Sequence, residues 1–266
     1  MSTTLFSRKL VLITGASSGI GLALARRLAA EGAVLALASR RIDEETTAQV
    51  VNHGASGAAP FPCDLSHGHE AEQLMSRVTR HFGRPVEMLI NAAAIPILGN
   101  AEDVPMQKIH ESFEVNFFAA VALCRAVIPE MKQRRSGYIV NITSGAAYRG
   151  LPVAFPYCAS KAALLSFSES LDVELSPYGV RVLTVSPGPV DTRFYANQEI
   201  FGQPGELFAP RHRRTPERAA EGILRGLRRN RTRLDLSWRG SLARHLNYWA
   251  PGLFDRMLMR KIKRPS

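Results

Sequence analysis

The chain has 266 residues, 45% of them hydrophobic, so one large domain can bury an adequate core. The balance of 34 Lys/Arg against 23 Asp/Glu is basic, and no apolar run approaches a secretory signal or a membrane span. Three cysteines (Cys63, Cys124, Cys158) stand in unrelated contexts, and no Cys/His cluster has metal-ligand spacing. We therefore expect reduced thiols, a cytoplasmic protein and no metal site.

Apolar runs alternate with helical patterns along the whole chain, without internal repeats. Strands are predicted at 9–14, 33–38, 58–62, 86–91, 137–143 and 180–185, with a short seventh at 232–236. Helices are predicted at 19–31, 43–53, 68–82, 106–133, 155–176 and 216–229. This alternation predicts an α/β class: a single-domain Rossmann fold, a doubly wound parallel sheet of about seven strands with helices on both faces.

The first predicted strand leads directly into a glycine-rich turn, which reads Thr14-Gly15-Ala16-Ser17-Ser18-Gly19-Ile20-Gly21. A strand, a glycine turn and a helix in this order are typical of a dinucleotide-binding unit. The glycines let the backbone approach the pyrophosphate, whose charge the helix N-terminus stabilises. The cofactor contacts predicted here are Gly15, Ser17, Ser18, Gly19, Ile20 and Gly21.

The residues after the second strand indicate which cofactor binds. The strand is followed by Ser39-Arg40-Arg41, and the first carboxylate is Asp43. An acidic residue here would bond the ribose 2′-hydroxyl of NAD, whereas an arginine accommodates the 2′-phosphate of NADP. Arg40 can hold that phosphate through its planar fork, so we expect NADP(H). The alternative is a solvated arginine pair at a helix start.

Two residues four positions apart, Tyr157 and Lys161, share a face if their segment is helical. A free phenol has a pKa near ~10 and transfers protons poorly at neutral pH. A nearby ammonium would lower that pKa and make the tyrosine a general acid/base. Ser144, 13 residues upstream, ends a strand-like run that opens onto a site. For the pair alone, the alternative is a packed tyrosine beside a solvated lysine.

Together these motifs resemble the short-chain dehydrogenase/reductase family, of the NADP(H)-preferring type, over residues 8 to 192. The TGxxxGxG motif matches at Thr14, Gly15, Gly19 and Gly21, and YxxxK matches at Tyr157 and Lys161 with Ser144 at the usual spacing. One motif departs, because the family's NNAG reads Asn91-Ala92-Ala93-Ala94 here. That substitution bears on the backbone beside the cofactor.

The resemblance implies further site residues. Asn116 stands where the family has its fourth catalytic residue, beside Ser144, Tyr157 and Lys161. Further cofactor contacts implied are Asp64 and Leu65 at the adenine, Asn91, Tyr157, Lys161, and Pro187, Gly188, Val190 and Thr192 at the nicotinamide carboxamide.

The implied activity is hydride transfer between NADP(H) and a ketone or secondary alcohol. In it, Ser144 bonds the substrate oxygen and Tyr157 transfers the proton. Lys161 lowers the tyrosine pKa and binds the nicotinamide ribose, while Asn116 holds a water in the proton path. Two alternatives stay open: a 3-oxoacyl-carrier-protein reductase, whose acidic carrier would dock on basic residues, and a non-catalytic NADP(H)-sensing regulator. A homodimer or homotetramer is expected.

The segment 193–214 has no clear period and contains Phe194, Tyr195, Phe201, Leu207 and Phe208. A long aromatic loop after the nicotinamide segment predicts a substrate lid and an apolar or lipid-like substrate, although a plain surface loop is the alternative. We therefore divide the chain into a dinucleotide-binding and catalytic core (1–192), a lid loop (193–215), and a C-terminal completion of the same domain with a basic amphipathic tail (216–266).

The positive charge is concentrated at the C-terminus. Residues 1–210 hold 18 Lys/Arg and 19 Asp/Glu, whereas residues 211–266 hold 16 and 4. After Pro251-Gly252, one helical side would carry Leu253, Phe254, Met257 and Leu258, and another Arg256, Arg260 and Arg264. This pattern is compatible with peripheral contact between residues 252–264 and an anionic membrane. The alternative is packing on the domain or a second subunit, and nucleic acid is the least favoured partner.

Overall fold

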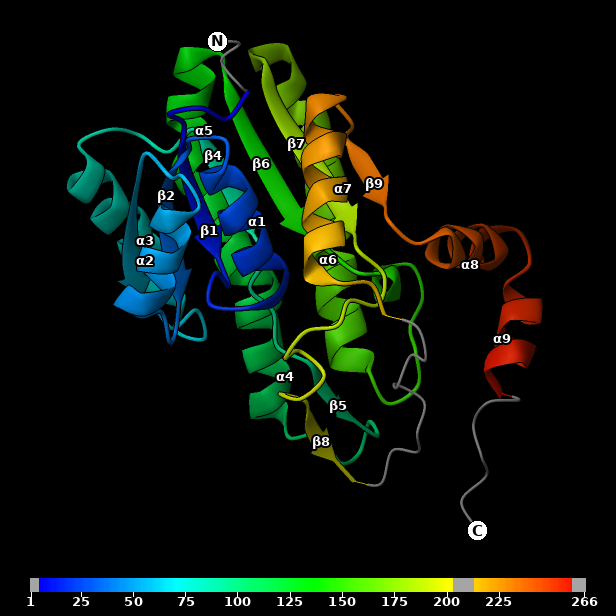
Figure 1. Cartoon of the computed structure of the whole chain (residues 1–266). Helices are drawn as coiled ribbons and strands as arrows, with labels where there is room; N and C mark the ends of the chain where they lie inside the picture. Colours follow the sequence, from blue (N-terminus) through cyan, green and yellow to red (C-terminus); the bar gives the residue numbers. More distant parts are fainter. Residues whose placement is uncertain (1–4, 203–212, 260–266) are drawn as a thin grey trace.

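The computed structural model describes residues 5–202 and 213–259 (Figure 1). Its main sheet has seven parallel strands: β1 (Leu10–Thr14), β2 (Val34–Ser39), β3 (Gly57–Pro62), β4 (Met88–Asn91), β6 (Gly137–Ile142), β7 (Val180–Ser186) and β9 (Arg233–Asp235). They lie in the order β3-β2-β1-β4-β6-β7-β9. The order reverses between β1 and β4, where a doubly wound sheet opens a crevice at its carboxyl edge. The predicted Rossmann sheet is confirmed.

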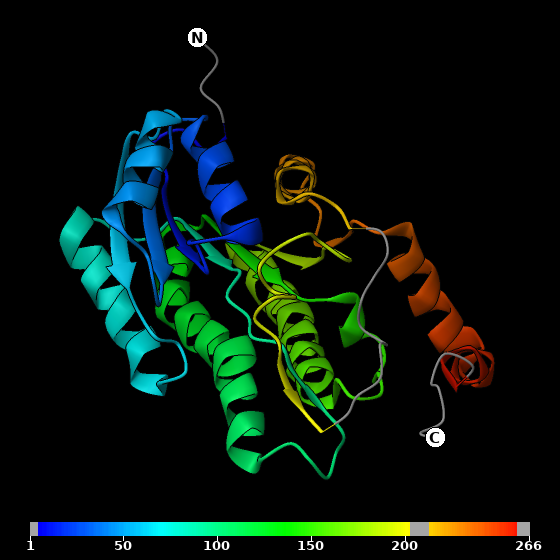
Figure 2. The ribbon, with the colours of Figure 1, turned by 60° about the horizontal axis from the view of Figure 1, so that its bottom comes forward.

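Helices cover both faces of this sheet (Figures 1 and 2). One face carries α1 (Gly19–Ala29), α2 (Glu44–Asn52) and α7 (Pro216–Arg228), and the other carries α3 (Gly68–Phe82), α5 (Ala119–Arg134) and α6 (Phe155–Leu175). In β1, Val11 and Ile13 pack toward the first group, while Leu10 and Leu12 pack toward the second. Both faces are buried, so the strand is apolar throughout instead of alternating.

The helix predicted at 106–133 is interrupted by a wider turn. It consists of α4 (Met106–Phe113), a π-helical turn η1 (Glu114–Phe118) and α5. The π turn contains Asn116, which is buried. By length and apolar composition alone, the described helix Met106–Arg134 is a candidate membrane span. Leu123, Val127 and Met131 nevertheless pack in the core, as in a buried helix of a globular domain.

Several short elements were not predicted. Strands β5 (Ile97–Gly99) and β8 (Glu199–Phe201) form a separate two-stranded parallel sheet. After β9 come α8 (Trp238–Trp249) and α9 (Pro251–Met259), which lie to one side of the sheet beyond β9 (Figures 1 and 2). Helix α9 begins where the sequence predicted the tail helix. The side chains of Phe254, Met257 and Leu258, and all of residues 260–264, lie outside the described part.

Candidate active site

The glycine turn closes against the loop after β4, at the reversal point of the sheet. Gly15 has φ +66°, and a Cβ on it would lie 2.9 Å from the backbone nitrogen of Ala93. Thr14 Oγ1 accepts hydrogen bonds from Ala92 N at 3.1 Å and Ala93 N at 3.2 Å. All three alanines of the Ala92–Ala94 segment keep negative φ angles, so this backbone does not need the family's glycine.

The same turn approaches the segment after β7. Gly19 has φ +56°, and its Cβ would lie 3.0 Å from Thr192 Cγ2, while a Cβ on Gly21 would lie 2.3 Å from Gly15 O. Ser17 and Ser18 lie between β1 and α1, and Ile20 lies in the first turn of α1. The structure therefore brings the predicted glycine turn and the predicted nicotinamide segment, Pro187 to Thr192, to one edge of the sheet. A glycine-lined approach of this kind fits a pyrophosphate.

The end of β2 presents hydroxyl and guanidinium groups. Ser17 Oγ and Ser39 Oγ hydrogen-bond at 2.8 Å, and the Arg40 side chain is exposed directly after the strand. The nearest carboxylate in sequence, Asp43, is used as the N-cap of α2, where it accepts from Thr46 N at 2.7 Å. A 2′-phosphate at this strand end would therefore meet donors and a positive charge.

Asp64 and Leu65 follow β3, at the same edge as Arg40. Asp64 Oδ1 accepts from Ser66 N at 3.0 Å and from Ser66 Oγ at 2.8 Å. Burial raises the pKa of Asp64, but these hydrogen bonds and the Arg40 charge outweigh it and hold the pKa below its ordinary value. The carboxylate is therefore ionised and orients the turn that the resemblance assigns to the adenine.

The proposed proton-transfer residues converge at the carboxyl end of β6. Ser144 follows this strand and begins the short turn η2 (Gly145–Ala147), and its hydroxyl lies close enough to the phenol of Tyr157 to lower the phenol pKa. Tyr157 and Lys161 both lie in α6. Lys161 is only 2% exposed, and its Nζ donates to Ile142 O at 3.0 Å. The helix thus presents the tyrosine and the lysine to one side of the sheet edge.

Burial controls the charge of this pair. It raises the pKa of Tyr157 well above the ordinary value, while the neighbouring Ser144 hydroxyl lowers it by less. Burial also lowers the pKa of Lys161 to about 7. Desolvation therefore disfavours both charged forms, and the role of Lys161 in lowering the tyrosine pKa stays a prediction. The phenol is protonated at neutral pH.

Asn116 is 1% exposed and joins the loop after β4 to α6. Its Oδ1 accepts from Ile95 N at 2.8 Å, and its Nδ2 donates to Ile95 O at 3.1 Å, Ser112 Oγ at 3.2 Å and Ser160 Oγ at 3.0 Å. Ser160 Oγ in turn donates to the carbonyl of Tyr157 at 2.9 Å. The amide therefore ties the loop after β4 to the start of α6, where Ser160 contacts the Tyr157 carbonyl.

Asn91 is placed differently from the other predicted cofactor residues. Its side chain is buried, and Nδ2 donates to Asn141 Oδ1 at 2.8 Å and to Cys124 Sγ at 3.5 Å. These partners belong to β6 and α5, on the core side of the sheet edge. A cofactor contact from Asn91 would therefore be made by its backbone.

The described part of the segment predicted to be a lid lies against Tyr157. The Phe194 ring is 5.3 Å from that of Tyr157, and Tyr195 stacks edge-on to Phe194 at 5.6 Å. The two ends of the loop are held together, since Asp191 N donates to Arg214 O at 2.8 Å. Leu207 and Phe208, also predicted in the lid, lie outside the described residues.

Two hydroxyl residues of this site, Ser39 and Ser160, were missed by the sequence analysis. Ser39 lies beside the recognised Arg40, and Ser160 lies inside the YxxxK segment. Their positions within these motifs were the available signal, but which partners their hydroxyls reach depends on the folded chain.

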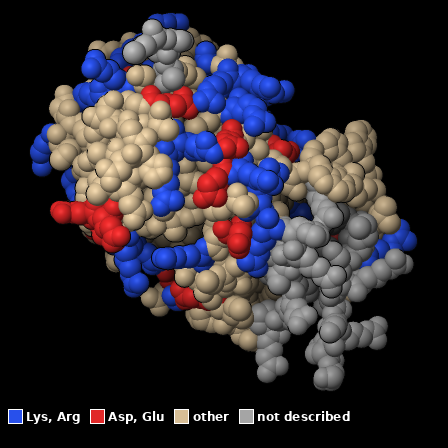
Figure 3. Space-filling view, viewed as in Figure 1, with Lys and Arg blue, Asp and Glu red and all other residues tan. Residues whose placement is uncertain are grey.

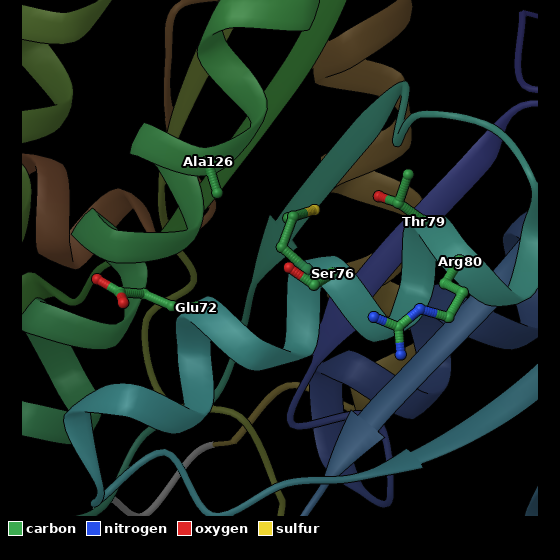
Figure 4. A pocket seen from close by; sticks show the side chains of 6 residues that line it. Glu72, Ser76, Thr79, Arg80 and Ala126 are labelled. Atoms are coloured by element: carbon green, nitrogen blue, oxygen red, sulfur yellow. The ribbon is translucent and has the colours of Figure 1, made fainter.

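A groove elsewhere on the surface is separate from this site. It lies between α3 and α5 and is lined by Glu72, Met75, Ser76, Thr79, Arg80 and Ala126 (Figure 4). None of the predicted catalytic or cofactor residues lines it. The candidate active site is therefore the carboxyl edge of the sheet.

Comparisons with known proteins agree with this geometry. The family model described as short chain dehydrogenase matches residues 9–200. The chain is 35% identical over 188 residues to dehydrogenase/reductase SDR family member 4 of Sus scrofa, covering 70% of this chain and 67% of the relative. It is 34% identical over 234 residues to 11-beta-hydroxysteroid dehydrogenase-like 3 of Arabidopsis thaliana, covering 86% and 73%. A short-chain dehydrogenase from Sphingobium yanoikuyae in complex with NADPH has a TM-score of 0.80 at 26% identity, covering 97% of each chain. The chain belongs to the short-chain dehydrogenase/reductase family of oxidoreductases.

Proposed function

We propose that this chain is an NADP(H)-dependent oxidoreductase that interconverts a ketone and a secondary alcohol. The observation that carries the proposal is the convergence of Ser144, Tyr157 and buried Lys161 at the sheet edge where the Gly15 turn lies. A nucleotide sensor would need the glycine turn alone. The serine and the tyrosine that lie together beside it favour proton transfer as well as binding.

NADP(H), when bound, supplies or accepts the hydride. Ser144 donates a hydrogen bond to the substrate oxygen, and the protonated phenol of Tyr157 transfers its proton to that oxygen as negative charge develops on it. In the oxidation direction the proton returns to the phenolate. Lys161 lies one helical turn from Tyr157, where its ammonium can hold the ribose. Asn116 keeps the loop after β4 and the start of α6 in position, and the family resemblance also assigns it a water in the proton path.

The end of β2 supports NADP(H) over NAD(H). Arg40 is exposed there, Ser17 and Ser39 bring two hydroxyls together, and the Asp43 carboxylate is occupied with the cap of α2. The Sphingobium yanoikuyae relative in fold is a complex with NADPH. An arginine fork matches a phosphate and has no comparable partner on a ribose hydroxyl.

The lid supports an apolar or lipid-like substrate. Phe194 and Tyr195 place two aromatic rings beside the phenol of Tyr157, so a substrate at this phenol would contact apolar surface. The name of the Arabidopsis thaliana relative contains a steroid substrate class, which agrees with this chemistry. A panel of apolar ketones, polar ketones and 3-oxoacyl thioesters, assayed with both cofactors, identifies the class.

The decisive test is the Tyr157→Phe variant. It removes the transferable proton and little contact surface, so NADPH oxidation with a ketone substrate should fall by orders of magnitude while NADPH binding, followed by its fluorescence, persists. Tyr178→Phe is the matched control, because Tyr178 lies outside the site and stacks on Lys132. Near-normal turnover in Tyr157→Phe would refute the catalytic assignment.

We further propose a cytoplasmic homodimer or homotetramer. Cys63, Cys124 and Cys158 are free and buried, which fits a reducing compartment. Phe118 and Val173 expose 49% and 76% of their surface on η1 and α6, and a second copy would cover such side chains. Light scattering coupled to size exclusion measures the assembly, and a monomer would contradict it.

A further inference from the structure

Helices α8 and α9, residues 238–259, form an arm beside β9 (Figures 1 and 2). The surface of this arm is rich in exposed apolar side chains. Six of the twelve exposed large hydrophobic side chains in the described structure belong to it: Trp238, Leu242, Tyr248, Trp249, Leu253 and Met259. Tyr248 is 77% exposed and Trp249 is 79% exposed, and their rings meet edge to face at 5.1 Å. Exposed hydrophobic residues scattered singly are ordinary, but such a cluster marks an interaction surface.

The arm is held to the rest of the chain by polar contacts instead. Asn247 Nδ2 donates to Tyr148 O at 2.8 Å, and Arg149 donates to Asn247 Oδ1 at 2.9 Å. Arg149 also forms an ion pair with Asp255 of α9. These contacts fix the arm to the loop that follows Ser144 and η2. Tyr248 and Trp249 are thus not packed on the described domain. Packing on the domain was one of the alternatives that the sequence left open for the tail.

The charge around the arm distinguishes between the remaining partners, which are a second subunit and an anionic membrane. From Trp238 to the C-terminus the sequence has seven Lys/Arg and one acidic residue, Asp255. Four of the basic residues, Arg260, Lys261, Lys263 and Arg264, directly follow α9. A two-fold contact between two arms would bring these like charges together. An anionic lipid surface would complement them, and its headgroup region favours tyrosine and tryptophan side chains.

The basic side chains on α7 have a different environment. Figure 3 shows Lys and Arg on this face of the molecule with carboxylates among them. Arg27 of α1 pairs with Glu221 of α7, and Arg228 of α7 pairs with Glu31. These two ion pairs compensate part of the charge of that face, and none of the exposed tyrosines and tryptophans of the described residues lies on α7.

We propose that the α8–α9 arm docks the protein on an anionic phospholipid surface. Tyr248 and Trp249 enter the headgroup boundary, and the positive charge that the sequence carries from Trp238 onward attracts the anionic headgroups. Because the arm is fixed to the Tyr148–Arg149 loop, the lipid surface then lies on the side of the domain that carries Ser144. Docking is a binding property, so its test does not depend on the proposed oxidoreductase activity.

The chain contains two tryptophans, Trp238 and Trp249, and both lie in the arm, so intrinsic fluorescence reports on it directly. The full-length protein is mixed with phosphatidylcholine vesicles with or without phosphatidylglycerol. With the anionic vesicles we expect co-sedimentation, a blue shift of the emission and quenching by brominated lipid. The binding should weaken as salt is added, since screening acts over about 8 Å at physiological ionic strength. Binding equally well to neutral vesicles, or the absence of a blue shift, would overturn the proposal.

Two variants separate the contribution of charge to vesicle binding from that of the aromatic side chains, and a third variant is the control. Each basic residue near an anionic surface raises partitioning roughly fivefold, so changing Arg260, Lys261, Lys263 and Arg264 to Gln should weaken binding at least about tenfold. The double variant Tyr248→Ser/Trp249→Ser should remove the salt-insensitive remainder, read by co-sedimentation.

The matched control changes four exposed arginines of α7 and its following loop to Gln: Arg218, Arg225, Arg229 and Arg231. It alters the net charge equally and should leave vesicle binding nearly unchanged. An equal loss in this control would show non-specific attraction and refute docking by the arm. A blue shift without vesicles that grows with protein concentration, and that disappears in Tyr248→Ser/Trp249→Ser, would also refute the proposal. It would show that a second copy of the chain covers Tyr248 and Trp249.

Discussion

Replacing Lys161 by methionine should make the stability of the protein less dependent on pH. Lys161 is 2% exposed, with one hydrogen bond from Nζ to Ile142 O at 3.0 Å, and burial lowers its pKa to about 7. In the unfolded chain a lysine has a pKa near ~10.4. Between these two values the unfolded state binds more protons than the folded state. The free energy of unfolding therefore rises with pH across this window, and levels off below and above it.

The expected size follows from the two pKa values. One pKa unit corresponds to roughly 1.4 kcal/mol, so the burial of Lys161 costs on the order of 4 kcal/mol at pH values below the window. Lys161→Met keeps a similar shape and does not titrate. Its stability advantage over the wild type should therefore shrink by roughly 2 kcal/mol between about pH 7.5 and about pH 9.

Urea unfolding of the cofactor-free proteins, followed by circular dichroism at several pH values, measures this difference. Lys132→Met is the control, since Lys132 forms an ion pair with Glu174 at 2.9 Å near the surface. The difference between this control and the wild type should vary little over the same range. A pH-independent difference for Lys161→Met would show that the buried amine keeps its proton, and would refute the account of burial.

Other parts of the site make distinct predictions. Arg40→Ala should weaken NADPH binding about 10- to 100-fold and hardly affect NADH binding, whereas Arg41→Ala should weaken NADPH binding less. Fluorescence titration measures both affinities. An unchanged ratio of the NADPH and NADH affinities in Arg40→Ala would place the phosphate elsewhere. Gly15→Ala should destabilise the fold by about 1–3 kcal/mol and abolish cofactor binding, because its φ is +66° and its Cβ would lie 2.9 Å from backbone; unchanged urea unfolding would contradict this. Glu199→Gln removes the 2.8 Å ion pair between Glu199 and Lys108, which holds β8. This ion pair is partly exposed, so it contributes at most about 1 kcal/mol to stability. Steady-state kinetics should show a KM a few-fold higher, and an unchanged KM together with an unchanged kcat would argue against a lid role.

The sheet and its helices follow closely from the sequence because their signals are strong. Strands buried on both faces read as apolar runs, as in Leu10–Thr14, and long amphipathic helices have a clear period. Helix α3 was predicted at 68–82 and is found as Gly68–Phe82. The strand order also follows, since alternating strands and helices leave few topologies for a parallel sheet.

The unpredicted elements are short or locally irregular. Strands β5 and β8 have three residues each, too few for alternation to appear, and they pair across about a hundred residues of sequence. The π turn Glu114–Phe118 has no sequence period of its own, and buried Asn116 is accommodated there by contacts with Ile95 and Ser160. Such features depend on tertiary partners that a linear pattern does not contain.

For Tyr157 and Lys161, the residue types and their spacing predict the placement of the side chains, but the surroundings determine their pKa values. Sequence spacing predicts that Tyr157 and Lys161 share a helix face, and they do lie together in α6. The sign of the tyrosine pKa change depends on how deeply the pair is buried, because burial disfavours the phenolate and the ammonium alike. Burial is the main reason that the phenol of Tyr157 keeps its proton at neutral pH. In the proposed reaction, this protonated phenol beside Ser144 is the form that donates a proton to a carbonyl oxygen.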